Sequence, residues 1–110
     1  MAFTAYHNIT GSSGVDNELL APGDDINNIK SIVIANIHAT ASAQVSLFIQ
    51  DDPESGATST FKLFNKINIP PGITLLLNDS SMLNFDNSAD GYGLYMNVGS
   101  GDTIDVSINI

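Results

Sequence analysis

The sequence contains no cysteine, no tryptophan and no arginine, and three lysines are its only formal cations. Without cysteine, both disulfide bonds and thiolate metal sites are excluded. Twelve acidic residues bring the formal net charge to −9 at pH 7. Proteins that bind nucleic acid use lysine and arginine to displace counterions from phosphates, and anionic membrane surfaces attract basic segments. We therefore expect no nucleic acid and no membrane among the partners of this protein.

Long apolar stretches are also missing. The longest apolar run covers residues 73–77 and is interrupted by Thr74, so it is far too short to cross a bilayer. Residues 1–7 lack a basic region followed by an apolar stretch, which is how a secretory signal begins. The sequence thus predicts a soluble protein made in the cytoplasm.

The apolar residues that are present follow the period of β-strands. They alternate with polar residues over 43–50, 92–98 and 103–110, which is typical of strands with one face in water. The segments 29–37 and 73–77 are apolar on both faces, as the central strands of a sheet are. No longer stretch carries the apolar spacing of an amphipathic helix without turn-forming residues inside it.

Turn-forming residues separate these runs at intervals of roughly 8–14 residues, the spacing of sandwich folds. The sequence therefore predicts an all-β fold over residues 1–110, a single-domain antiparallel β-sandwich that is jelly-roll-like and has about eight strands. Residues 1–14 could form an extended N-terminal arm and hinge. The expected strands cover 2–9, 17–21, 29–38, 43–50, 58–68, 73–78, 82–85, 92–98 and 103–110.

Two histidines, His7 and His38, are the first candidates for acid–base or metal chemistry. Neither lies in a nucleophile-elbow or a His-Glu-x-x-His motif, so a structural role is the better interpretation of both. We therefore predict no catalytic residue and no cofactor, and we do not expect an enzyme.

The loop at 86–91 offers a second candidate, because Asp86, Ser88 and Asp90 have the spacing that opens an oxygen-rich calcium loop. The position that should carry a bidentate glutamate is Asn97, inside an expected strand. An acidic turn is the preferred interpretation, and these three residues are the only candidate metal ligands. A calcium- or carbohydrate-binding module is the alternative from another class, although the lack of tryptophan argues against a sugar site.

Six segments together carry a resemblance to a known family, namely residues 6–10, 29–36, 38–52, 67–77, 91–94 and 104–106. They resemble short virion structural proteins of marine tailed phages, cyanophages in particular. The resemblance implies a small jelly-roll-like subunit that is displayed on the particle or built into it, and it implies no active site.

From this resemblance we expect a capsid decoration (cement) protein, made in the host cytoplasm and located in the virion. Its partner would be the major capsid protein or another virion protein, and the subunit itself would be a homo-oligomer, a trimer being our guess. A tail, neck, baseplate or fibre component of the same particle is the alternative. The apolar segment 1–10 is the expected docking arm. The residues predicted to make contact are Phe3, Tyr6, His7 and Ile9.

Overall fold

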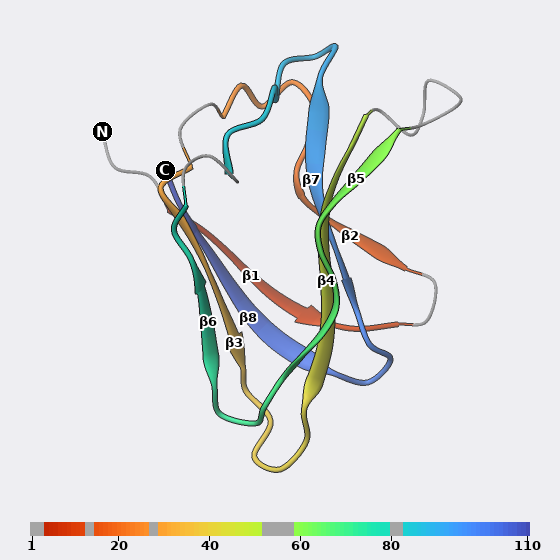
Figure 1. Ribbon diagram of the computed structural model, residues 1–110, viewed down its shortest axis with the longest axis vertical. Helices are drawn as coiled ribbons and strands as arrows, with labels where there is room; N and C mark the ends of the chain where they lie inside the picture. The colour runs from red at the N-terminus through yellow and green to blue at the C-terminus, as the bar shows by residue number, and fades with distance from the viewer. Residues whose placement is uncertain (1–3, 13–14, 27–28, 52–58, 80–82) are drawn as a thin grey trace.

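The computed structural model describes residues 4–12, 15–26, 29–51, 59–79 and 83–110 (Figure 1). In this part of the chain no helix is long and apolar enough to span a lipid bilayer. Eight strands are formed: β1 (Thr4–Thr10), β2 (Asp16–Leu20), β3 (Ser31–Asn36), β4 (Ala43–Asp51), β5 (Thr60–Ile69), β6 (Thr74–Leu77), β7 (Tyr92–Val98) and β8 (Thr103–Asn109).

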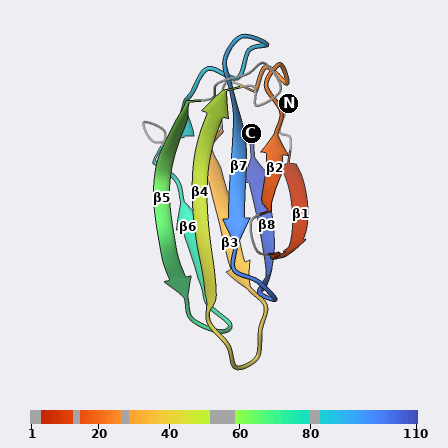
Figure 2. The same cartoon turned by 90° about the vertical axis from the view of Figure 1, so that its right-hand side faces the viewer.

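The strands make two antiparallel sheets of four strands each, which face one another (Figure 2). The first sheet has the order β1-β8-β3-β6 and the second sheet has the order β2-β7-β4-β5. Apart from the β4–β5 hairpin, each strand is followed in sequence by a strand of the other sheet. This order is that of a jelly roll, so the predicted sandwich is confirmed.

The core lies between the sheets and consists of the apolar residues that alternate along the strands. In β8, Ile104, Val106 and Ile108 are at most 1% exposed, as their alternation with polar residues predicts. Burial of each such side chain contributes about 1.5–3 kcal/mol, and this packing fixes which face of every strand points inward. The core also includes Ile32, Ile34, Val45, Leu47, Leu83, Leu94, Met96 and Val98.

Two expectations about strands are wrong. Residues 83–85 are not in a strand; Leu83 instead places its side chain, 1% exposed, in the core. The apolar segment 73–77 is not a central strand, because β6 is the last strand of the first sheet and Leu76 is 54% exposed. The segment 29–37 does contain a central strand, since β3 lies between β8 and β6.

The N-terminal segment is part of the sandwich and not an arm. Thr4–Thr10 form β1, which pairs with β8 from Thr4↔Asn109 to Thr10↔Thr103. The hinge expected after it begins with Gly11, which is buried and hydrogen-bonded to the β7–β8 loop on both its N–H and its carbonyl. A side chain on Gly11 would collide with the carbonyls of Val98 and Gly99. Residues 1–3 and 13–14 lie outside the described residues.

Candidate functional site

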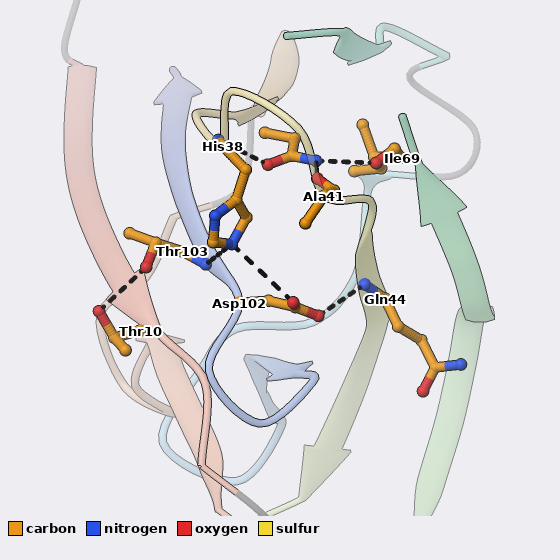
Figure 3. A network of polar contacts seen from close by, with 8 residues as sticks. Thr10, His38, Ala41, Gln44, Ile69, Asp102 and Thr103 are labelled. Atoms are coloured by element: carbon orange, nitrogen blue, oxygen red, sulfur yellow. Dashed lines mark hydrogen bonds and ion pairs between the residues drawn. The ribbon is translucent and has the colours of Figure 1, made fainter. Parts of the chain in front are cut away.

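A polar cluster around His38 and Asp102 lies at the end of the sandwich where the β3–β4 and β7–β8 loops meet (Figure 3). His38 Nε2 accepts a hydrogen bond from the backbone N–H of Thr103 at 3.0 Å and lies 3.9 Å from Asp102 Oδ1. The other carboxylate oxygen, Asp102 Oδ2, accepts from the backbone N–H of Gln44 at 3.0 Å. The cluster therefore joins the start of β8 to β4 and to the β3–β4 loop.

The hydrogen bond at Nε2 decides what His38 can do chemically. Because Nε2 is an acceptor, the neutral ring carries its proton on Nδ1. No lone pair of Nε2 is then left to take a proton from a nucleophile. The hydroxyls of Thr10 and Thr103 lie 3.5 Å from each other. Through the hydrogen bond that it accepts from Thr103, the His38 imidazole holds the β7–β8 turn in place.

Asn36 anchors the same end of the molecule. Its side chain is 2% exposed, and its Nδ2 donates to the carbonyls of Ala41 at 2.8 Å and Ile69 at 2.9 Å. Its Oδ1 accepts from the backbone N–H of His38 at 2.9 Å. One buried amide thus ties the β3–β4 loop to the end of β5, and each of its polar atoms has a partner.

Asn87 has the same role at the opposite end. This residue is fully buried, and its Nδ2 donates to the carbonyls of Ala21 at 2.9 Å and Tyr92 at 2.8 Å. Its Oδ1 accepts from the backbone N–H of Ile26 at 3.0 Å, and its carbonyl accepts from two more N–H groups of the β2–β3 loop. The 86–91 loop is therefore built around a structural asparagine.

The candidate calcium ligands lie in this loop. Asp86 Oδ1 accepts from the backbone N–H of Ser88 at 3.0 Å, and the Ser88 hydroxyl and then this backbone N–H lower the pKa of Asp86 below its ordinary value of 3.8. Asp90 is exposed. Among the described residues, no group of three or more histidine, cysteine, aspartate or glutamate side chains is placed to hold a metal ion. The loop is organised as an Asx turn, in which Asp86 already binds the chain's own donors.

The predicted docking residues lie in different environments. Ile9 is buried in the core at 7% exposure, because it lies opposite Ile104 on the inner face of β1, so its proposed contact role is wrong. His7 is half-buried beside a shallow hollow of about 450 Å³, and its buried Nε2 has no hydrogen-bond partner in the described part of the chain. The backbone of Tyr6 pairs with Ser107, and Phe3 lies outside the described residues.

The outer face of the second sheet carries a row of contacts that crosses all four strands. Glu18, Tyr95, Phe48 and Lys62 face one another in register on β2, β7, β4 and β5. The Tyr95 hydroxyl donates to Glu18 at 3.3 Å, the Tyr95 and Phe48 rings stack with centroids 5.9 Å apart, and Lys62 Nζ lies 4.1 Å from the centre of the Phe48 ring. Both rings are at most 5% exposed. They are therefore covered and cannot offer a stacking surface to a sugar.

The outer face of the first sheet is nearly free of charge. Among the residues of β1, β3, β6 and β8, Asp105 alone carries a formal charge, and it accepts a hydrogen bond from Asn8 at 2.6 Å. Leu76 lies on this face opposite Val33, and it is 54% exposed. Two more exposed apolar residues, Ile37 and Ile73, lie at the end of β3 and the start of β6. Among the described strands, this face is therefore nearly uncharged, and Leu76 is its strongly exposed apolar residue.

Analysis of the sequence missed both the asparagine anchors and the aromatic row. Nothing local distinguishes Asn36 or Asn87 from the other asparagines, because their partners are distant in sequence. The aromatic row did leave a signal. Phe48 and Tyr95 both occupy positions that alternation assigns to the wet face, and an aromatic residue there on two strands indicates a side chain that is covered by its neighbours.

Comparison with known proteins gives little further information. No protein-family model matches the sequence, and no curated protein matches it. Among solved structures, the Yersinia pseudotuberculosis-derived mitogen (YPM) is similar with a TM-score of 0.43 and 10% sequence identity, over 99% of this chain and 83% of that chain. A similarity at this level carries no argument about what this protein does.

Proposed function

We propose that this protein is a non-enzymatic structural subunit of a phage particle that decorates the capsid by docking onto the major capsid protein. The observation that carries the proposal is the outer face of the first sheet, which has a single charged strand residue in a protein of net charge −9. Charged residues are depleted at the centre of protein interfaces, because their desolvation is costly. A neutral face that carries the exposed Leu76 is therefore suited to being covered by another protein.

Two further arguments support this role. The sequence resembles virion proteins of marine tailed phages, and jelly rolls are a recurrent architecture of capsid proteins, although a fold alone does not determine a function. In addition, the polar groups of the His38–Asp102 cluster and of both anchoring asparagines are used in holding loops together. Docking would stabilise the shell by burying surface across the seams between capsid subunits.

The acidic remainder of the surface would act before contact is made. Interactions between complementary charges steer two proteins toward each other and raise the association rate more than they raise the affinity. We expect a basic surface on the shell around the site where the neutral face docks, and we expect association to slow as salt screens the charges.

The copy number in purified particles tests the proposal. Quantitative mass spectrometry against the major capsid protein should give a ratio near one copy per capsid subunit, or one oligomer per local symmetry axis of the shell. A few copies per hundred capsid subunits would instead support a tail, neck, baseplate or fibre component. Absence of the protein from the particle would refute a virion role altogether.

A variant of the neutral face tests how the subunit docks. Leu76→Glu places a charge on the outer face of the first sheet, and Asn84→Glu places one on an exposed residue outside the strands. Because both side chains are exposed, we expect both variants to fold. Occupancy on particles should fall at least about tenfold for Leu76→Glu and stay near wild type for Asn84→Glu. Equal occupancy of both variants would show that another surface makes the contact.

A further inference from the structure

The two edge strands of the second sheet carry opposite charges. β2, at one edge, has Asp16 and Glu18, and β5, at the other edge, has Lys62 and Lys66 (Figure 2). All four side chains are exposed. These lysines are two of the three cations in a chain with twelve acidic residues, so their placement on one edge strand gives this sheet an acidic side and a basic side.

The register of the strands aligns these four charged residues in two rows that cross the sheet. The first row starts at Glu18, crosses the Tyr95–Phe48 pair and ends at Lys62. The second row starts at Asp16, which accepts a hydrogen bond from Asn97 at 3.1 Å, and continues to Ser46.

The second row ends at a β-bulge in β5. Here two residues, Asn65 and Lys66, lie between the paired positions Phe64 and Ile67 and face Ser46. The Ser46 hydroxyl donates to Asn65 Oδ1 at 3.2 Å and accepts from the backbone N–H of Lys66 at 2.9 Å. Lys66, which has a positive φ of 52°, belongs to this bulge and therefore lies at the end of the Asp16 row. Each row therefore has a carboxylate on β2 and a lysine on β5.

These charges favour one edge-to-edge contact between two copies of the chain and disfavour the others. A two-fold contact between β5 strands would bring Lys62 and Lys66 against the same lysines, and a contact between β2 strands would oppose carboxylates. Both contacts are disfavoured by repulsion of like charges. A β5 edge beside a β2 edge would instead place Lys62 next to Glu18 and Lys66 next to Asp16 in one register. It would also continue the antiparallel alternation of the sheet, since neighbouring strands run in opposite directions throughout β2-β7-β4-β5.

We propose that the partner at these edges is a second copy of this chain, bound head to tail with β5 of one copy against β2 of the next. A contact of this kind uses two different surfaces, so repeated copies close into a ring when the rotation between them allows it. The inference rests on the proposed function, because it specifies how copies of the decoration subunit join. It leaves the neutral face of the first sheet free to meet the shell.

Sedimentation analysis of the purified full chain tests the contact without any particle. We expect an oligomer at low ionic strength that dissociates in about 1 M salt, because exposed charge pairs are screened. Glu18→Lys and Lys62→Glu should each raise the dissociation constant by about tenfold or more. Asp90→Lys and Lys30→Glu make the same changes in net charge on exposed residues outside the two edges, and they should leave it unchanged.

Charge reversal supplies the decisive comparison. An equimolar mixture of the Glu18→Lys and Lys62→Glu chains should associate more strongly than either chain alone. Contacts between unlike chains pair opposite charges at positions 62 and 18, whereas contacts between like chains pair equal charges there. A chain with both substitutions should self-associate like the wild type. Circular dichroism and thermal melting would identify a variant that fails to fold, and Glu18→Gln or Lys62→Gln, which removes the charge without reversing it, would then take its place.

Three outcomes overturn the inference: a wild-type chain that is monomeric at low ionic strength, an oligomer that neither substitution weakens, or no recovery in the mixture and the double variant. None of them bears on docking to the shell, which is measured by occupancy on particles. Loss of shell binding in an intact oligomer would refute the proposed function and leave the head-to-tail contact standing.

Discussion

Buried asparagines hold the ends of this sandwich, one at each end. Asn36 joins the β3–β4 loop to the end of β5, and Asn87 joins the β6–β7 loop to the β2–β3 loop. An amide is suited to this task because it donates and accepts at once, and so it satisfies backbone groups of both signs. The loops are fixed by these contacts, since a buried polar group left unpaired is costly.

Substitution of Asn87 should therefore destabilise the protein strongly, although this residue lies outside the strands. Asn87→Ala leaves two carbonyls and one N–H without their partners, and we expect the free energy of unfolding to fall by about 3 kcal/mol. Chemical denaturation measures this change. Asn84→Ala, an exposed residue three positions earlier, is the control and should stay within about 0.5 kcal/mol of the wild type. Similar values for the two variants would contradict the anchoring role.

Asp86 should make stability depend on pH in the acidic range. Its pKa in the folded protein lies below the ordinary value of 3.8, first because of the Ser88 hydroxyl and then because of the Ser88 backbone N–H. A depressed folded pKa stabilises the protein above the unfolded pKa, and the contribution is lost as the pH falls through the folded pKa. The stability difference between wild type and Asp86→Asn should thus shrink below about pH 4.

Denaturation curves from about pH 6 to about pH 2.5 measure this difference. Ser88→Ala is the matched variant, because it removes the larger cause of the shift and leaves the backbone N–H in place. It should reduce the pH dependence only in part. A difference between wild type and Asp86→Asn that does not change with pH would show that the carboxylate gains nothing from the turn.

At the scale of elements, the position of a strand in its sheet decides how much its apolar residues contribute to stability. β4 lies inside the second sheet with Leu47 fully buried opposite Met96, whereas β6 lies at the edge of the first sheet with Leu76 more than half exposed. Close packing makes the buried leucine more important for stability. When a side chain among close-packed neighbours is shortened, the protein loses both the transfer free energy of the removed atoms and their contacts.

The pair Leu47→Ala and Leu76→Ala measures this contrast. The first variant should lower the free energy of unfolding by about 2–5 kcal/mol, through transfer free energy and cavity formation. The second should change it by less than about 0.5 kcal/mol, because water already covers much of Leu76. A large cost for Leu76→Ala in the isolated chain would mean that β6 is covered in solution, and the oligomer would then have to use this edge.

At the scale of the whole molecule, the sandwich has two unlike sheets. The first sheet is almost uncharged along its strands, and the second has a basic edge and an acidic edge. In the proposed assembly, the subunit would meet the shell through the first sheet and its own copies through the second. The large negative charge then opposes unspecific association, because copies repel one another in most orientations.

A calcium titration separates this assembly role from that of a calcium-dependent binding module. If the 86–91 loop is the Asx turn described above, the melting temperature of the full chain should not change on adding millimolar calcium or on chelation. Differential scanning calorimetry measures it. A rise of several degrees with calcium, reversed by chelation and lost in Asp86→Asn, would instead favour the calcium-binding module.

The sequence by itself determined the strands and their faces. Alternation along 103–110 and 92–98 placed their apolar residues in the core, and the turn residues between runs set where most strands end. It also determined which charges each strand carries, since no arrangement of strands can move Lys62 off its own strand. These features are local, because they depend on residues one or two positions apart.

Only the tertiary structure decided which strands are neighbours and which lie at an edge. The segments 29–37 and 73–77 look alike in sequence, but one forms the interior strand β3 and the other the edge strand β6. The same holds for Asn36 and Asn87, whose partners lie up to 33 and 66 residues away. The physical reason is that the period of a strand fixes which way a side chain points, whereas pairing between strands depends on the long-range packing of the whole chain.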